Sequence, residues 1–256
     1  MTEITHQGLG LAAISYDSPA VLKAFSDKHG ITFPLLSDEG SQTITAWGLL
    51  NREATGRTAG IPYPGTYVID PKGVILSRAF ETAYQERDSA ASILAGLQGA
   101  ATPPLPGTTQ VQGQQVVLRV SATDTIAAPG HRITLIVDVT PGPKVHVYAP
   151  GQTGYIPVAL TVDPSGDVKA GPARYPAPYD YVFAPLKETV KVFDRPFRIM
   201  QDVTLALTPA LRQRATANET LTITGAVDYQ ACNDTVCFRP DHVPVRWTIA
   251  LTPIER

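Results

Sequence analysis

The first hundred residues alternate short apolar runs with segments of helical periodicity. Residues 8–16 form a mostly apolar run of strand length without polar alternation, as expected for a strand covered on both faces. Asp17-Ser18-Pro19 then supplies a polar cap and a proline at the first helical position, so a helix is predicted from here to Gly30. The apolar side chains expected to share one face of this helix are Val21, Leu22 and Phe25.

The same alternation continues through the rest of this region. We expect, in order, a strand, a helix, two strands and a helix at residues 33–36, 37–50, 66–70, 74–78 and 88–97. The inner face of the helix at 37–50 is predicted to carry Ile44, Trp47 and Gly48. Pro71-Lys72-Gly73 is a tight-turn sequence, so the two strands around it should form an antiparallel hairpin. The order β-α-β-α-β-β-α indicates an α/β layer domain over residues 1–99.

A different pattern follows. Residues 100–113 have no periodicity and contain three prolines, which predicts a stiff linker. Beyond it, helix signals nearly vanish and short strands alternate with Pro- and Gly-containing turns. The predicted strands are 116–120, 132–139, 144–148, 158–162, 189–192, 203–207, 220–229 and 243–251. This pattern is typical of a β-sandwich, here expected over residues 114–256.

Composition narrows the classes of function. The chain has 256 residues, of which 43% are apolar and 17% charged, and its net charge is −2. That charge excludes a strongly basic nucleic-acid-binding surface. No apolar run reaches the roughly 18 residues that a membrane-spanning helix needs. The N-terminus also lacks the basic and apolar segments of a secretory signal.

Both cysteines of the chain lie within residues 227–237. Cys232 follows one predicted strand, Cys237 precedes the next, and Asn233-Asp234-Thr235 between them has turn composition. A hairpin of this size would bring their Cα atoms roughly 5–6 Å apart, within disulfide reach.

Three roles for the pair stay open. A structural staple closing so short a loop is worth roughly 2 kcal/mol, little for a sandwich of this size. A metal clip would lack ligands, because the nearest histidine, His242, stands alone. We therefore favour a redox pair and expect no metal and no cofactor.

The sequence Val-Asp-Tyr-Gln-Ala-Cys-Asn-Asp-Thr-Val-Cys-Phe-Arg-Pro at 227–240 resembles the Tyr-Gln-x-Cys…Cys-x-x-Pro signature of the N-terminal domain of DsbD-type thiol:disulfide interchange proteins. The resemblance covers roughly residues 114–253. It implies an immunoglobulin-like sandwich that receives electrons from a membrane partner and passes them to periplasmic oxidoreductases. Familiar members have five residues between the cysteines, whereas this chain has four.

The resemblance also implies the site residues. Cys232 and Cys237 would be the exchanging pair, and their expected neighbours are Tyr148, Tyr229, Gln230 and Asp234. The segment 179–188 falls where the family has a cap over the disulfide. Taken without the resemblance, Tyr148, Tyr179 and Tyr181 are ordinary sandwich aromatics, and His146 is an ordinary strand histidine.

Residues 7–98 resemble the AhpC/TSA-type redoxins, the peroxiredoxin-like branch of the thioredoxin fold. The matching segments are 11–19, 25–38 and Pro64-Gly-Thr-Tyr-Val-Ile-Asp-Pro-Lys-Gly73. By this resemblance Pro64 is a candidate cis-proline. The reactive cysteine of that family sits on a helix that would precede residue 8, so this half is expected to be a truncated redoxin domain without a nucleophile.

The leading hypothesis is a thiol–disulfide redox protein whose partner is a thioredoxin-like or membrane thiol–disulfide protein. One rival is a non-enzymatic scaffold with a structural disulfide. The other is a fragment of an antioxidant thiol peroxidase whose catalytic cysteine lies upstream. We expect a periplasmic location if the true start lies upstream, and a second copy or partner covering the incomplete redoxin sheet.

Overall fold

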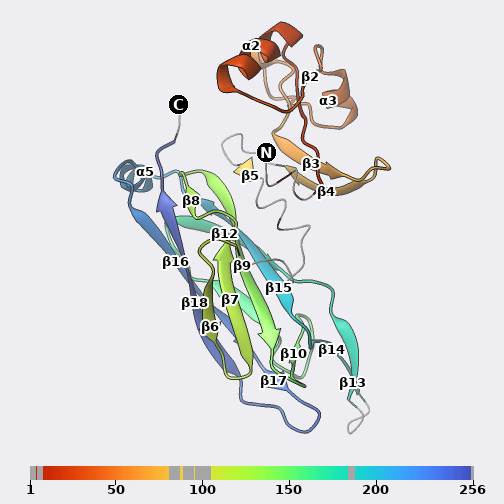
Figure 1. Ribbon diagram of the computed structural model, residues 1–256, viewed down its shortest axis with the longest axis vertical. Coiled ribbons are helices and arrows are strands. Elements are labelled where there is room, and N and C mark those ends of the chain that lie inside the picture. Colours follow the sequence, from red (N-terminus) through yellow and green to blue (C-terminus); the bar gives the residue numbers. More distant parts are fainter. Residues whose placement is uncertain are drawn as a thin grey trace. The chain divides into compact units, whose positions relative to one another are not determined.

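The structure is a computed structural model that describes residues 4, 8–80, 87–88, 95, 105–183 and 188–254. The chain divides into two compact units, Met1–Arg87 and Asp88–Arg256 (Figure 1). A two-residue strand, β5 (Arg87–Asp88), lies at the boundary between them. Among the described residues, no helix combines the length and the apolar character needed to cross a membrane.

The first unit has the predicted order of elements. They are β1 (Ala13–Ser15), α2 (Pro19–His29), β2 (Leu35–Ser37), α3 (Gln42–Ala46), the 3-10 helix η1 (Gly56–Thr58), β3 (Gly65–Ile69) and β4 (Ile75–Phe80). Strands β1 and β2 pair in parallel, whereas β3 and β4 form the predicted antiparallel hairpin. The helix predicted at 88–97 lies mostly outside the described residues.

Helix α2 has its predicted ends, but its apolar side chains differ in burial. Pro19 stands at its first turn, and Gly30 ends it in the left-handed conformation with φ +62°. Leu22 is buried, but Val21 and Phe25 remain 53% and 51% exposed. The three apolar side chains expected on one face therefore differ in burial, since only Leu22 is covered.

Two further predictions in this unit need correction. The helix predicted at 37–50 is only five residues long, because Gly40 and Ser41 both have positive φ before it and Gly48 has positive φ after it. The peptide bond before Pro64 is trans, not cis. From the bridge between Pro62 and Leu50, the chain passes through Pro64 directly into β3.

The second unit is built mainly of strands. They are β6 (Thr109–Gln112), β7 (Val116–Ala122), β8 (Ile126–Ala127), β9 (His131–Pro141), β10 (His146–Tyr148), β11 (Ala159–Val162), β12 (Val168–Arg174), β13 (Tyr179–Phe183), β14 (Glu188–Phe193), β15 (Phe197–Leu205), β16 (Thr220–Tyr229), β17 (Ala231–Cys232) and β18 (Asp241–Leu251), with helix α5 (Pro209–Thr216) between β15 and β16. The described strands form three sheets, in the orders β12-β15-β9-β7-β6, β11-β16-β18-β8 and β13-β14-β10-β17.

The core lies between the sheet β12-β15-β9-β7-β6 and the sheet β11-β16-β18-β8, which form the immunoglobulin-like sandwich (Figure 1). Every second residue of β18 is buried, from Val243 to Leu251, as period-two alternation requires. These side chains meet the buried residues of β7, β9 and β15. The indole N–H of Trp247 donates to the carbonyl of Ser121 at 2.8 Å, which links the two layers. The β-sandwich prediction is confirmed.

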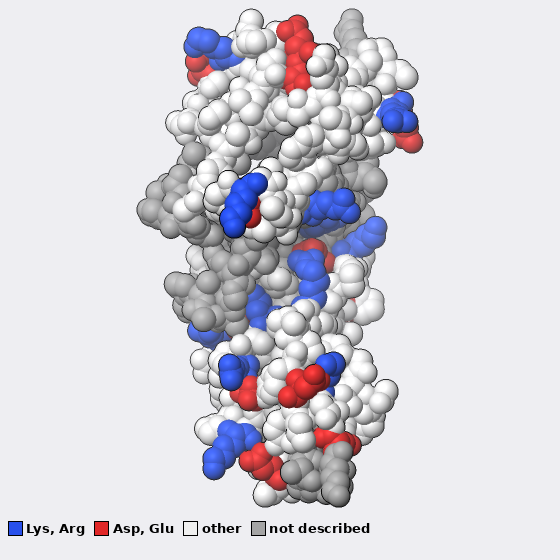
Figure 2. Space-filling model, turned by 90° about the vertical axis from the view of Figure 1, so that its right-hand side faces the viewer, with Lys and Arg blue, Asp and Glu red and all other residues white. Residues whose placement is uncertain are grey.

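Sequence patterns missed several elements of this unit. Strand β6 lies inside the predicted linker, because Val111 packs against the sandwich core. Helix α5 was not predicted, although Thr208 and Pro209 form a cap and first turn and the Thr208 hydroxyl accepts from Leu211 N at 3.2 Å. Strands β8, β12, β13 and β17 were also missed. On the face seen in Figure 2, acidic and basic side chains adjoin at several scattered places, and most of the surface carries neither.

Candidate functional site

Cys232 and Cys237 form a disulfide on the third sheet. Their Cα atoms are 4.0 Å apart, closer than the 5–6 Å expected from sequence. The two residues form an antiparallel bridge flanked by Asn233 N–H to Val236 O at 2.9 Å and Phe238 N–H to Ala231 O at 2.8 Å. This makes them a non-hydrogen-bonded cross-strand pair, the closer of the two kinds of pair in an antiparallel ladder.

The two sulfur-bearing residues have different environments. Cys232 is 1% exposed and belongs to a small apolar cluster with Tyr148, Val190 and Val192. Cys237 is exposed. Of the two residues, Cys237 is therefore the one in contact with solvent.

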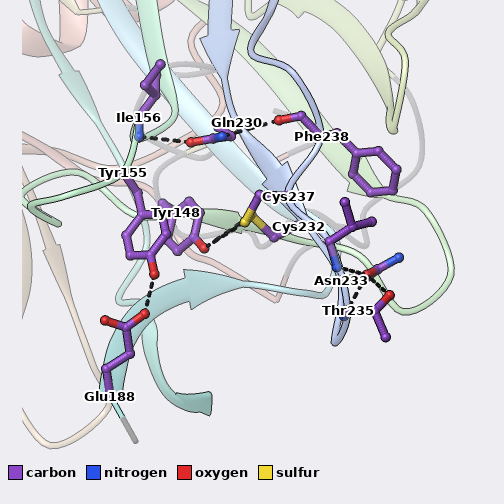
Figure 3. The surroundings of a disulfide bond; sticks show 11 residues. Tyr148, Tyr155, Ile156, Glu188, Gln230, Cys232, Asn233, Thr235, Cys237 and Phe238 are labelled. Atoms are coloured by element: carbon purple, nitrogen blue, oxygen red, sulfur yellow. Dashed lines mark hydrogen bonds between the residues drawn. A yellow bond between two sulfur atoms is a disulfide. The ribbon is translucent and has the colours of Figure 1, made fainter. Parts of the chain in front are cut away.

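Tyr148 contacts the disulfide. It lies on β10, the strand that pairs with β17 and places His146 opposite Cys232. The Tyr148 hydroxyl donates to Cys232 Sγ at 3.2 Å and lies 3.6 Å from Cys237 Sγ (Figure 3). Burial, and then the neighbouring Tyr155, raise the pKa of Tyr148 well above its usual value. The phenol thus stays protonated and remains a hydrogen-bond donor to sulfur.

A second tyrosine supports the first. The ring of Tyr155 stacks on that of Tyr148 with centroids 4.0 Å apart. The Tyr155 hydroxyl donates to Glu188, and this bond raises the pKa of Tyr155 (Figure 3). Glu188 begins β14 and belongs to the segment 179–188 that was expected to form a cap.

Strand β13 contributes a third tyrosine. The Tyr181 hydroxyl donates to Asp234 Oδ1 at 2.6 Å, and this bond raises the pKa of Tyr181. Asp234 lies in the spacer between the cysteines, so the bond ties β13 to that spacer. The ring of Tyr181 lies 4.6 Å from that of His146, which is only 4% exposed. Burial lowers the pKa of His146, while Asp234 and Asp194 oppose the shift.

The two remaining predicted neighbours of the cysteine pair, Gln230 and Tyr229, have different structural roles. Gln230 holds the base of the hairpin, because its amide donates to Phe238 O at 3.2 Å and its carbonyl accepts from Ile156 N at 3.5 Å (Figure 3). Tyr229 packs in the main core, and its hydroxyl donates to Asp241 at 2.7 Å. The structure thus brings Tyr148, Gln230 and Asp234 to the pair, whereas Tyr229 supports the sandwich beneath it.

Sequence reasoning missed two contributors. Tyr155 lies in an irregular loop without periodicity, so no pattern pointed to it. Asn233 was recognised only as turn composition, yet its side chain holds the spacer through three hydrogen bonds. Among the described residues, no group of three or more His, Cys, Asp and Glu side chains could hold a metal ion.

Comparisons with known proteins separate the two halves of the chain. Residues 1–78 match the family model of the AhpC/TSA family. A protein of Mycobacterium tuberculosis named as a peroxiredoxin is 39% identical over 75 residues, which are 29% of this chain and 48% of that protein. Chloroplastic peroxiredoxin Q of Populus jackii is 38% identical over 68 residues, 27% of this chain and 30% of that protein. The chain thus spans half or less of the length of these relatives.

Part of the chain is also similar to two solved structures. The N-terminal periplasmic domain of ScsB from Proteus mirabilis has a TM-score of 0.38 and 14% identity, over 57% of this chain and 51% of that one. The reduced N-terminal domain of DsbD from Neisseria meningitidis has a TM-score of 0.32 and 12% identity, over 59% and 91%.

A second family model, that of the N-terminal domain of the thiol:disulfide interchange protein DsbD, matches residues 113–246. This match covers more than half of the chain and includes both cysteines. The chain carries a partial redoxin region followed by an immunoglobulin-like domain with a disulfide, a combination that supports a thiol–disulfide redox role. Through this second domain, the chain belongs to the family of the N-terminal domain of the thiol:disulfide interchange protein DsbD.

Proposed function

We propose that Cys232 and Cys237 exchange electrons with a thioredoxin-like or membrane thiol–disulfide partner. The observation that carries this proposal is the asymmetry of the pair: Cys237 is exposed, while the buried Cys232 sulfur accepts a hydrogen bond from Tyr148. A bond that only joined two strands would not need a phenol directed at one of its sulfurs.

The asymmetry assigns a role to each cysteine. A thiolate of the reduced partner attacks Cys237 Sγ, the bond between the two sulfurs breaks, and Cys232 leaves as a thiolate. The Tyr148 hydroxyl donates to that thiolate, which weakens its tendency to attack back. The second partner thiol then attacks the partner's own sulfur in the mixed disulfide and releases Cys237. Two electrons pass to this protein, and the partner becomes a disulfide.

The reverse sequence reduces an oxidised client. Three tyrosines, Tyr148, Tyr155 and Tyr181, pack around the buried side of the pair and leave the Cys237 side as the approach. Access of this kind limits exchange to partners that fit the site. By analogy with the family of the N-terminal domain of DsbD, we place the exchange in the periplasm, an oxidising compartment.

The redoxin-like half has a different part in this proposal. Residues 1–99 contain no cysteine, so thiol chemistry in this chain is confined to the sandwich. We propose that the redoxin-like domain comprises residues 1–99 and that the sandwich comprises 114–256 together with β6. The first domain would act as a scaffold or docking surface.

Trapping the mixed disulfide tests the exchange. Thioredoxin with its resolving cysteine replaced is first converted to the mixed disulfide of its remaining cysteine with thionitrobenzoate. In the Cys232→Ser variant the Cys237 thiolate should attack that thioredoxin sulfur, release thionitrobenzoate as the leaving thiolate and form the protein–protein mixed disulfide. The matched Cys237→Ser variant should form far less, because Cys232 is buried. Equal trapping of both variants would contradict the assigned roles.

The rival function is a structural disulfide in a scaffold protein. The observation in its favour is that backbone hydrogen bonds on both sides of the pair already hold the hairpin. A reduction potential below about −300 mV, together with no exchange with reduced thioredoxin, would favour this rival over the redox role.

A further inference from the structure

The spacer between the cysteines is organised by one side chain. The Asn233 carbonyl oxygen accepts from the backbone N–H of Thr235 at 2.9 Å, the hydroxyl of Thr235 at 2.9 Å and the backbone N–H of Val236 at 2.8 Å (Figure 3). Asparagine side chains that bond the backbone two residues on fold the chain into a turn. The spacer is thus a turn built on Asn233.

This turn does not depend on the sulfur–sulfur bond. The backbone bonds on either side of the pair, from Asn233 N–H to Val236 O and from Phe238 N–H to Ala231 O, involve no sulfur atom either. Below the turn, Gln230 also bonds Phe238 O. The hairpin therefore keeps its hydrogen bonds when the disulfide is reduced.

A turn of this kind changes the redox equilibrium. Two thiols re-form a disulfide more readily when they are already held close, because less conformational freedom is lost on closing the ring. A spacer that is ordered in the dithiol form thus favours the oxidised form. A spacer that is loose in the dithiol form favours the reduced form.

We propose that Asn233 is a positioning residue that holds the reduced cysteines near their disulfide geometry and so sets the redox equilibrium of the pair. This inference deepens the proposed function, since it concerns the regulation of the same site. Asn233 acts through the turn and makes no contact with the reacting sulfurs in its described hydrogen bonds.

Equilibration with glutathione measures the effect. Two molecules of reduced glutathione give one electron each to the protein disulfide, forming the protein dithiol and one oxidised glutathione. Asn233→Ala should raise the equilibrium constant for reduction about tenfold, which equals a rise of about 30 mV in reduction potential. Re-formation of the disulfide after dilution of the reductant should slow by a similar factor.

Matched variants separate the turn from its surroundings. Asn233→Asp keeps the acceptor and should stay within about twofold of wild type. Asn233→Gln moves the acceptor by one methylene and should behave like Asn233→Ala. Asn51→Ala removes a similar turn bond in the first unit, where Asn51 Oδ1 accepts from Glu53 N–H at 3.0 Å, so its equilibrium constant should stay near wild type. Circular dichroism checks that each full-length variant is folded.

Two outcomes would overturn the inference. One is that folded Asn233→Ala and Asn233→Gln both keep the wild-type equilibrium constant; the other is that Asn233→Asp shifts it as far as Asn233→Ala does. Neither depends on a protein partner. Failure of the wild type to exchange with thioredoxin would instead contradict the proposed function and leave the glutathione result intact.

Discussion

The hydroxyl of Tyr148 reaches the buried sulfur of Cys232 at 3.2 Å, from the strand that lies beside it in the sheet. A hydrogen bond to a charged acceptor is worth about 1.5–3 kcal/mol, more than one to a neutral acceptor. The contact therefore strengthens when Cys232 leaves as a thiolate.

Tyr148→Phe should slow reduction of the disulfide by reduced thioredoxin by at least about tenfold, because it removes the donor to the leaving thiolate. Stopped-flow fluorescence measures this rate. Tyr175→Phe is the control, since the Tyr175 hydroxyl accepts from Leu160 N and belongs to the main core. Equal rates for the Tyr148 variant and wild type would show that the phenol does not assist departure.

Tyr181→Phe should increase the rate at which a small dithiol reduces the pair, by about fivefold. The substitution removes the 2.6 Å bond between β13 and Asp234, and one such bond is worth about 1 kcal/mol. Dithiothreitol is the probe. Asp234→Ala should reproduce the increase, whereas Asp234→Asn, which keeps an acceptor, should not. Unchanged rates in both Tyr181→Phe and Asp234→Ala would argue against a restraint by this bond.

The stability of the sandwich should fall as pH drops from about 7 to 5. Because burial lowers the pKa of His146, the unfolded chain takes up a proton near the ordinary histidine value of about 6.5 that the folded chain resists. Stability from the neutral imidazole is therefore complete above that pH and is lost below it. Each unit by which the pKa is lowered corresponds to about 1.4 kcal/mol.

Urea unfolding of the oxidised protein at pH 7.5 and 5 measures this loss. His146→Phe keeps an aromatic ring beside Tyr148 and Tyr181 but cannot titrate, so it should lose less stability over the same interval. An identical loss in the variant would assign the pH dependence to groups other than His146.

Gly225→Ala should destabilise the sandwich by about 2–3 kcal/mol. A Cβ atom on Gly225 would overlap with the carbonyl of Thr161 on the neighbouring strand β11, and neither backbone can move without breaking the ladder. Gly171→Ala is the matched control, because its added Cβ would lie 3.5 Å from Asp202 O, an ordinary contact. Thermal unfolding of the two variants should differ clearly; equal midpoints would be the contrary result.

The sequence was most informative where a local pattern determines the structure. Pro19 and Gly30 predicted both ends of α2, and Pro71-Lys72-Gly73 predicted the β3–β4 hairpin. The alternation in β16 and β18 predicted strands that are paired along their whole length. The Cys232–Cys237 hairpin followed from the same kind of reasoning.

The sequence was least informative where contacts between distant segments determine the structure. Tyr155 joins the site only because an irregular loop returns over Tyr148, and no spacing encodes that return. Helix α2 shows the same limit, because periodicity indicates which side chains share a face but not whether anything covers them. Tyr229 belongs to the signature sequence, yet its strand directs it into the main core.

The narrow cross-strand placement of Cys232 and Cys237 has a consequence for recognition. Since the ladder bonds lie on either side of the pair and not across it, changing the oxidation state breaks no amide hydrogen bond. We therefore expect the oxidised and reduced proteins to keep the same backbone hydrogen bonds. A partner would then tell them apart by the sulfurs and the side chains around them, and would deliver or withdraw electrons at a surface whose backbone stays the same.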